Sequence, residues 1–343
     1  MKVAVVGVTG VVGETILRVL DERKIPIDEL GAFASRDRNE PLRYRERDWP
    51  IRTATPEALA AGGYDAVFFA SSDDASAELA RGCVASGAAV IDNSATFRLS
   101  DDVPLIVPEV NPEAARAEDR IFPVANCTAI VLCVGLAPIA RVAGLRSVRV
   151  ATYQAVSGAG KSGLEALASE ESAAHGGDES SSRSPFAAPI FRNVIPLVGS
   201  SVDAFGDSGE EKKVAAETRK ILGLPNLHIA ATTVRVPVRY AHSEAAFIET
   251  ERDTTVAELS EALASAPGVA FHRSGIVTPR DVEGQDLVHV ARLRAEDGSK
   301  RHFQVWIVGD QVRKGAATNA VQIFELLVAR GFVGGPRRRA AAR

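Results

Sequence analysis

The first 125 residues alternate between short apolar runs and segments whose apolar residues recur at helical spacing. Residues 2–6 (KVAVV) form a continuous apolar run, which is typical of a parallel strand covered on both faces. A glycine turn, GVTGVVG, and a helical pattern, ETILRVLDER, follow it. Strand-like runs return at 29–35, 64–71 and 88–94, with a helical pattern over 74–87. This alternation predicts βαβ units around a parallel sheet, and therefore an α/β fold.

The pattern changes from residue 144 onward. Helical patterns over 210–222 and 255–265 separate longer β-rich runs: LRSVRVATYQAVSG, HIAATTVRVPV, SEAAFIET and KRHFQVWIVGD. We therefore expect a second domain of α+β type with a larger, more open sheet. The expected boundaries are 1–125 for the first domain, completed by an apolar helix over 315–335, and 126–314 for the second. The Ser/Gly-rich stretch 171–184 is expected to form a loop and 336–343 a flexible tail.

Length and composition agree with this division. A chain of 343 residues is long for one core and suits two domains. Its 46% apolar and 24% charged residues are those of a globular protein, and a net charge of −4 argues against a dedicated nucleic-acid surface. No apolar run is long enough for a membrane span, and the N-terminus does not read as a signal peptide.

The cysteines indicate a reducing compartment, so we expect the cytoplasm. They lie at positions 83, 127 and 133 without a CxxC pair. Neither a disulfide framework nor a metal site is therefore expected.

Gly7, Gly10 and Gly13 form a G-x-x-G-x-x-G turn between the first strand and a helix. This context predicts a dinucleotide site, because glycine lets the backbone approach a pyrophosphate at the helix N-terminus. A plain tight βα turn is the alternative. The second strand ends in Ser35 and Arg36. Arginine suits a 2′-phosphate and favours NADP, whereas the neighbouring Asp37 leaves NAD as a weaker alternative.

Cys127 lies in FPVANCTAIVL, between an apolar run and the apolar helical pattern AIVLCVGLAPIARV. A helix N-terminus lowers the pKa of a thiol and so favours a nucleophilic thiolate. From its position alone, Cys127 is either a nucleophile or a small buried hydrophobe. Cys83 and Cys133 lie inside helical patterns and are expected in the core.

His242 differs from the other histidines because it follows Arg235 by seven residues in TVRVPVRYAHSE. On one straight strand an odd separation would place the two side chains on opposite faces. Pro237 and the following RYA indicate that the strand ends and turns between them, so that both side chains can reach one cleft. A structural histidine is the alternative.

Nearly the whole chain resembles the aspartate-β-semialdehyde dehydrogenase family. The resemblance rests on motifs in the family's order: GVTGVVG, NSATFR with VPEVN, NCTAI, QAVSGAG, NVIP, EEKK with ETRKI, RVPV with HS, and GAATNAVQI. It implies a Rossmann-type dinucleotide-binding domain plus an α+β catalytic and dimerisation domain of the glyceraldehyde-3-phosphate-dehydrogenase-like type. It also implies a homodimer or a dimer of dimers.

The implied reaction is the NADPH-dependent reductive dephosphorylation of L-aspartyl-β-phosphate to L-aspartate-β-semialdehyde through a cysteine thioester. This reaction is reversible and belongs to the biosynthesis of lysine, methionine and threonine. By the same resemblance, Cys127 is similar to the nucleophile, His242 to the general acid/base, and Gln154 to the residue that orients the acyl-thiol intermediate.

The resemblance also assigns binding positions. Arg235 matches the group that binds the substrate α-carboxylate, and Glu210 matches the group that binds its amino group. The phosphate-binding positions are Arg98, Asn126 and Lys213. The expected cofactor-binding positions are Gly7, Thr9, Gly10, Val11, Val12, Gly13, Ser35, Arg36, Ser71, Ser157, Gly158 and Asn319.

The chain departs from the family pattern at three places. Thr128 replaces a common serine, ASRDRNE replaces the usual ASxRSAG, and SSDDAS brings Asp73 and Asp74 close to the cofactor region. The nearest rival enzyme is N-acetyl-glutamyl-phosphate reductase, whose cysteine lies in a GCYPT-like stretch. The sequence also leaves open a catalytically silent paralogue and a general NAD(P)-binding protein with a structural Cys127.

Overall fold

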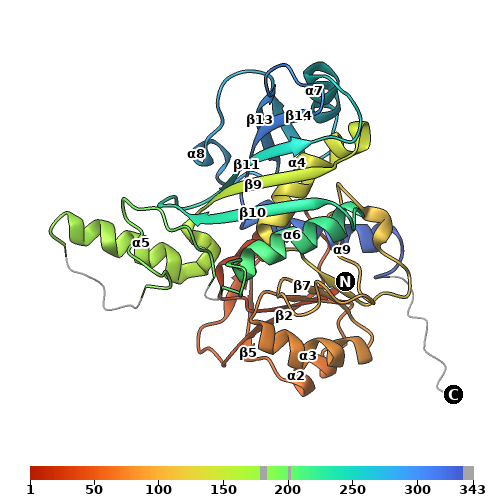
Figure 1. The fold of residues 1–343 in the computed structure, drawn as a ribbon. Coiled ribbons are helices and arrows are strands. Elements are labelled where there is room, and N and C mark those ends of the chain that lie inside the picture. Colours follow the sequence, from red (N-terminus) through yellow and green to blue (C-terminus); the bar gives the residue numbers. More distant parts are fainter. Residues whose placement is uncertain (178–183, 200–201, 335–343) are drawn as a thin grey trace. The chain divides into compact units, whose positions relative to one another are not determined.

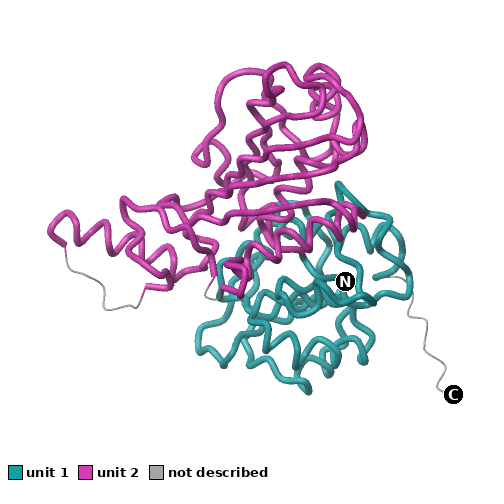
Figure 2. The backbone as a smooth tube through the Cα atoms, viewed as in Figure 1, with its two compact units in different colours: residues 1–124, 317–343 teal, residues 125–316 magenta. Residues whose placement is uncertain are grey.

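The structure is a computed structural model that describes residues 1–177, 184–199 and 202–334. The chain folds into two compact units (Figure 2). Unit 1 contains Met1–Val124 and the segment from Ala317 onward, and unit 2 contains Ala125–Ala316. The expected tail 336–343 lies outside the described residues, as do residues 178–183 of the expected Ser/Gly-rich loop.

Unit 1 is built on a six-stranded parallel sheet with the order β5-β2-β1-β6-β7-β8 (Figure 1). Its strands are β1 (Lys2–Val6), β2 (Glu29–Ala34), β5 (Ile51–Thr53), β6 (Ala66–Phe69), β7 (Ala89–Asp92) and β8 (Ile121–Pro123). The strands β6 and β7 are buried along their whole length, which is why they appear in the sequence as continuous apolar runs. A short hairpin, β3 (Leu42–Tyr44) and β4 (Arg47–Trp49), stands beside the sheet. The predicted parallel sheet is confirmed.

Both faces of this sheet carry helices. On one face, Val6 and Phe69 pack with Leu59 and Leu79. Leu59 belongs to α2 (Pro56–Ala61) and Leu79 to α3 (Asp73–Ala85). On the other face, the Phe68 ring meets Phe324 of α9 (Asn319–Ala329), with the ring centroids 5.5 Å apart. Helix α1 (Val11–Glu22) contacts α9 there.

The terminal helix is shorter than the expected 315–335. A π-helical segment, Arg313–Thr318, precedes α9, and α9 ends at Ala329. Gly331 follows with φ +71°, a left-handed conformation that ends helices. The apolar pattern of GAATNAVQIFELLVARGF does not separate the π-helical segment from the α-helix that follows, because both are largely buried.

Unit 2 contains a six-stranded mixed sheet with the order β10-β9-β11-β14-β13-β12. Its strands are β9 (Ser147–Gln154), β10 (His228–Arg235), β11 (His242–Glu249), β12 (Val269–His272), β13 (Val288–Ala295) and β14 (His302–Gly309). The outer pairs β9–β10 and β12–β13 are parallel, and the other pairs are antiparallel. The predicted α+β sheet is confirmed.

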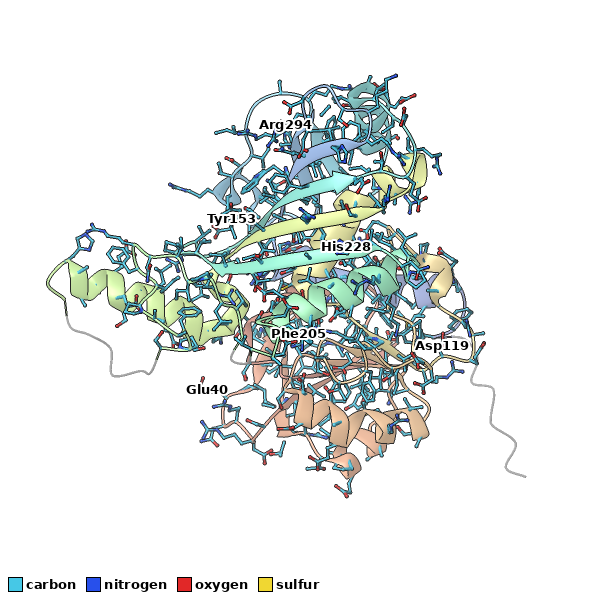
Figure 3. The ribbon with its side chains drawn as sticks, viewed as in Figure 1. Glu40, Asp119, Tyr153, Phe205, His228 and Arg294 are labelled. Carbon is cyan, nitrogen blue, oxygen red and sulfur yellow. The ribbon has the colours of Figure 1, made fainter. Side chains whose placement is uncertain are left out.

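One face of this sheet is covered by helices, and the other is more open. Helix α4 (Cys127–Ala143) contacts β11, β13 and β14 and is flanked by α6 (Gly209–Leu222) and α7 (Val256–Ala264). On the opposite face Tyr153 is 39% exposed and Phe247 43% exposed; Figure 3 labels Tyr153 near the end of β9. The short helix α8 (Pro279–Val282) contacts β14. Within the described ranges, no helix is long and apolar enough to cross a membrane.

The expected loop 171–184 begins with helix. After a 3-10 turn (Val156–Ala159), helix α5 continues from Gly160 to Ala174. Its sequence, LEALASEESAA, is rich in alanine, leucine and glutamate, which favour helix. The serines within this stretch concealed that preference, so the loop prediction is wrong for residues 171–174.

Candidate active site

Three predicted site residues lie at one end of the unit 2 sheet. Gln154 is the last residue of β9 and Arg235 the last of β10, and the two are paired in register. His242 is the first residue of the antiparallel strand β11, whose next residue pairs with Tyr153. The chain therefore ends one strand at Arg235, turns, and begins the next at His242. This confirms the turn that the odd spacing and Pro237 predict.

Cys127 is the first residue of helix α4, as expected. Asn126 is the N-cap, and its Oδ1 accepts hydrogen bonds from the N–H groups of Thr128 (3.0 Å) and Ala129 (3.2 Å). Cys127 is a partly exposed residue, whereas the other two cysteines are buried. The positive end of the helix dipole favours a thiolate at this position.

The other cysteines have the opposite environment. Cys83 is 2% exposed and Cys133 is fully buried, so their placement in the core is confirmed. Burial raises the pKa of Cys83 to about 11 and raises that of Cys133 as well. Both remain neutral thiols, and neither is a candidate nucleophile.

The His242 ring has a defined proton arrangement. Its Nδ1 accepts a hydrogen bond from the backbone N–H of Ala155 at 3.0 Å. The neutral ring therefore carries its proton on Nε2, which has no hydrogen-bond partner among the described residues. Burial first, and then the charge of Arg235, holds the pKa of His242 well below its usual value. At neutral pH the side chain is thus an uncharged donor at Nε2.

Arg235 lies next to His242 in a buried position. Its Nη1 donates to the carbonyl oxygen of Ala155, and its guanidinium carbon lies 5.6 Å from the centre of the Phe186 ring. Burial lowers the pKa of Arg235, and the negative charges of Cys127 and Glu210 act against this shift. The guanidinium stays charged, because an arginine pKa begins above 12.

Gly158 leaves the space in front of these two side chains open. A Cβ atom there would lie 2.7 Å from Arg235 Nη1 and 3.3 Å from His242 Nε2. The neighbouring Ser157 hydroxyl makes two hydrogen bonds within unit 2. It donates to the carbonyl oxygen of Arg239 and accepts from the side-chain amide of Gln311.

Glu210 connects the start of helix α4 to the end of strand β9 through two hydrogen bonds. Its Oε1 accepts from Asn126 Nδ2 at 3.0 Å and from Gln154 Nε2 at 3.2 Å. The Gln154 oxygen in turn accepts from the Thr152 hydroxyl at 3.1 Å. Lys213 lies one turn after Glu210 on α6. The structure therefore brings Asn126, Gln154 and Glu210 into direct contact within unit 2.

Arg98 and most of the expected cofactor positions belong to unit 1. The Arg98 guanidinium donates to the carbonyl oxygens of Val124 (2.8 Å) and Asn93 (2.7 Å). Asn319 is fully buried, and its Nδ2 donates to the Ile106 carbonyl oxygen at 3.1 Å.

The glycine turn fits a dinucleotide. Gly7 has φ +93°, and a Cβ there would lie 2.3 Å from the Ala70 carbonyl oxygen. A Cβ on Gly13 would lie 2.1 Å from the Gly7 carbonyl oxygen. The turn cannot form with side chains at these positions, and Gly10 leaves the N-terminus of α1 without a side-chain cap. Helix α1 thus begins without a side-chain cap at the glycine turn, an arrangement that suits a pyrophosphate, and Thr9, Val11 and Val12 belong to the same turn and helix start.

The end of β2 and the start of α3 add two observations. Ser35 and Arg36 are exposed after β2, whereas the Asp37 carboxylate is occupied by the N–H (2.6 Å) and hydroxyl (2.8 Å) of Thr53. These bonds lower the pKa of Asp37. Ser71, which follows β6, has a buried hydroxyl with no hydrogen-bond partner among the described residues.

Sequence reasoning missed several residues of this region. Glu217 accepts the backbone N–H of Asn126, Gln311 accepts that of Ala241, and Phe186 contacts Arg235. Only Glu217 had a sequence signal, because it follows Glu210 by seven residues and so shares its helix face. The other two contacts join segments that nothing local connects.

Two family models match the chain. Residues 136–314 match "Semialdehyde dehydrogenase, dimerisation domain", and residues 2–118 match "Semialdehyde dehydrogenase, NAD binding domain". The aspartate-semialdehyde dehydrogenase of Aquifex aeolicus is 40% identical over 342 residues, which cover 97% of this chain and 99% of the relative.

Solved structures agree with these matches. A crystal structure of aspartate semialdehyde dehydrogenase II from Vibrio cholerae has a TM-score of 0.89 and 36% identity, covering 96% of this chain and 98% of that one. A second structure of the same enzyme, in complex with ASA, gives the same values. The chain belongs to the aspartate-semialdehyde dehydrogenase family.

Proposed function

We propose that this protein is an NADP-dependent aspartate-semialdehyde dehydrogenase that reduces L-aspartyl-β-phosphate to L-aspartate-β-semialdehyde through a thioester on Cys127. The observation that carries the proposal is the placement of a partly exposed thiol at the first position of α4, in the same unit as Arg235, Glu210 and His242. This substrate requires three groups: a nucleophile for its acyl carbon, a cation for its α-carboxylate and an anion for its ammonium group.

The covalent step begins with Cys127. Its thiolate attacks the acyl carbon, the bond from that carbon to the phosphate oxygen breaks, and phosphate leaves with the electron pair. When bound, the nicotinamide would supply a hydride to the thioester carbon, or accept one in the reverse direction. The oxyanion on that carbon would expel the Cys127 thiolate, with the electron pair of the C–S bond going to the sulfur, and become the aldehyde carbonyl.

His242 stabilises the oxyanion of this step. Because Nδ1 accepts the Ala155 N–H, the proton at Nε2 is available to the developing negative charge. The lowered pKa keeps the ring neutral, so it does not attract the thiolate as a competing ion pair. Gln154, held between Thr152 and Glu210, orients the acyl-thiol group.

Arg235 and Glu210 are assigned to the two charged ends of the substrate. A guanidinium binds a carboxylate through two parallel hydrogen bonds, and the Phe186 ring supports its plane. A free amino group needs an anion, and Glu210 supplies one. This requirement favours the aspartyl substrate over an N-acetylated one, and Arg98, Asn126 and Lys213 are the groups that we assign to phosphate.

NADP is the cofactor that we assign, with Gly7, Gly10 and Gly13 holding its pyrophosphate. The engagement of Asp37 with Thr53 supports this choice, because two hydrogen bonds to one carboxylate oxygen tie Asp37 to that residue. Arg36 is exposed and can pair with a 2′-phosphate. The measurement is the ratio of kcat/KM for NADP to that for NAD; Arg36→Ala should lower the ratio, and an unchanged ratio would remove the assignment.

The open face of the unit 2 sheet is the surface that we assign to a second copy of the chain. Two hollows of about 370 and 550 Å³ lie on it, and Phe247 lines both. Trp306 and Arg294 line the first, and Figure 3 labels Arg294 on β13. The ring of Tyr153, which is 39% exposed, lies with its centroid 5.5 Å from that of the partly buried Trp306, and aromatic side chains at a surface are typical of a protein interface.

The test of the proposed function is the phosphate-dependent reduction of NADP with L-aspartate-β-semialdehyde. Activity that requires phosphate supports the thioester route. A folded protein without activity on this substrate would contradict the proposal. N-acetyl-glutamate semialdehyde, assayed in parallel, then distinguishes the rival reductase from a catalytically silent paralogue.

A further inference from the structure

Helix α6 carries two glutamates that both contact the residue before Cys127. Glu210 Oε1 accepts from Asn126 Nδ2 at 3.0 Å, and Glu217 Oε2 accepts from the Asn126 backbone N–H at 2.5 Å. Seven residues separate the two glutamates, which is two helical turns or about 10.5 Å of rise on one helix face. Asn126 is therefore held from two sides by one rigid element.

The two oxygen atoms of Asn126 accept hydrogen bonds from N–H groups of α4. Its Oδ1 accepts from Thr128 and Ala129, and its carbonyl oxygen accepts from Ile130 at 2.9 Å. Every hydrogen-bonding group of the residue thus has a partner. Because Cys127 directly follows, these bonds leave its backbone little freedom.

Gly315 packs against Cys127, the first residue of α4. A Cβ atom on Gly315 would lie 2.8 Å from the Cys127 Cβ and 3.2 Å from its Cα. The Cys127 backbone is thus packed on one side by a glycine that admits no larger residue, and held on the other through Asn126.

Glu217 occupies an unfavourable position for a carboxylate. It is 1% exposed, between buried Val214 and Ile221 on the face of α6 that points inward. Removing a carboxylate from water costs several kcal/mol unless hydrogen bonds and charges compensate. An apolar side chain would fill this site at lower cost, but it would leave the Asn126 N–H without its acceptor.

We propose that Glu217 is a positioning residue for Cys127: through the Asn126 N–H it holds the N-cap of α4, and with it the thiolate, in the reactive geometry. The inference rests on the proposed role of Cys127 as the nucleophile. Without the acceptor, a buried N–H loses its partner at a cost of about 1–3 kcal/mol. The cap then relaxes, and the thiolate loses part of the favourable field of the helix N-terminus.

Two variants separate the hydrogen bond from the charge. Glu217→Gln removes the charge and keeps an oxygen acceptor, whereas Glu217→Ala removes both. Glu211→Gln is the matched control, because Glu211 lies on the same helix but bonds to Ser208 and Thr233 and not to Asn126. If the alanine variant does not fold, Glu217→Met, which is of similar length but has no oxygen acceptor, replaces it.

Two readouts are measured on the full chain. The first is kcat and KM for L-aspartate-β-semialdehyde. The second is the pH dependence of Cys127 alkylation by iodoacetamide, with the modified peptide identified by mass spectrometry. A merely structural role would lower stability without moving the alkylation profile.

We expect kcat of Glu217→Ala to be about tenfold or more below that of Glu217→Gln. KM should be nearly unchanged, because Arg235 remains in place, and the alkylation profile should shift to higher pH relative to Glu217→Gln. The Glu211→Gln control should match the native protein in both readouts. Equal kcat and equal profiles for the alanine and glutamine variants would overturn the inference.

The two proposals fail in different ways. A native protein without phosphate-dependent activity on the semialdehyde would overturn the proposed function. The alkylation comparison would still test Glu217, because it needs only the thiol.

Discussion

At the scale of single residues, the proposed chemistry depends on one thiol and its surroundings. Cys127→Ala should lower turnover at least about a thousandfold, because no other described cysteine is accessible enough to replace it. Activity is measured in both directions, and circular dichroism checks the fold. Cys83→Ala is the matched control, a buried thiol outside the site that should keep kcat. A clearly smaller loss of turnover in Cys127→Ala would contradict the nucleophile assignment.

Arg235→Lys should weaken substrate binding more than it slows the chemical step. An ammonium keeps the charge but not the planar pair of hydrogen bonds, and the Phe186 ring no longer supports a plane. We expect KM for the semialdehyde to rise about tenfold or more. Steady-state kinetics give KM and kcat separately, and an unchanged KM would show that Arg235 does not bind the carboxylate.

Glu244 should make stability depend on pH. It is fully buried, and neither of its oxygens has a hydrogen-bond partner among the described residues. Burial raises the pKa of Glu244 well above its usual value, so the folded protein retains this proton after the unfolded chain has released it. The contribution to stability is complete below about pH 4.5 and is lost as the pH rises through the folded pKa.

Glu244→Gln removes that titration. The free energy of unfolding of the variant, relative to the native protein, should therefore increase from pH 5 to pH 8. Urea unfolding at the two pH values measures it, and other titrating groups cancel in the difference. A difference that does not vary with pH would contradict the raised pKa.

At the scale of elements, the first βα turn is the most constrained. Gly13→Ala would place the alanine Cβ 2.1 Å from the Gly7 carbonyl oxygen. This distance is too short for two non-bonded atoms, so the turn must open. NADPH affinity, measured by fluorescence titration, should fall about tenfold or more, because the N–H groups no longer converge on the pyrophosphate. Iodoacetamide modification of Cys127, which lies in unit 2, is the control and should keep its rate. An unchanged affinity would show that the turn does not bind the cofactor.

Elements also differ in how readily the sequence predicts them. Strands β1, β2 and β6 are apolar runs and helices α3, α6 and α7 have a helical period, and the expected ranges lie within a few residues of the observed ones. The strands β3, β4 and β5 have three residues each, too few to establish a period, and were not expected. Helix α5 was partly missed because serine content outweighed the helix preference of its alanines and leucines.

At the scale of the whole molecule, the open sheet face is the surface expected to join two copies. Phe247→Asp places a charge in both hollows of that face, and it should shift the protein toward monomer. Sedimentation velocity measures the state, and Phe205→Asp is the control, because Phe205 is 94% exposed and lies outside both hollows. A dimer of unchanged stability in Phe247→Asp would place the interface elsewhere.

The sequence by itself determined the two kinds of sheet, the glycine turn, and the position of Cys127 at the start of a helix. These follow from local spacing: apolar periods, glycines that tolerate no side chain, and polar residues at an element's end. It also indicated a chain turn between Arg235 and His242, from Pro237 and an odd separation.

Only the tertiary structure decided which hydrogen-bond partners those residues have. The Ala155 N–H sets the proton of His242 on Nε2, and Thr53 occupies Asp37. Glu217 reaches the N–H of Asn126, 91 positions away in the chain. Such partners depend on strand pairing and helix packing between distant segments, and a hydrogen bond between groups far apart in sequence produces no periodic pattern in the sequence. The physical reason is that local preference selects the elements, whereas long-range packing selects the contacts between them.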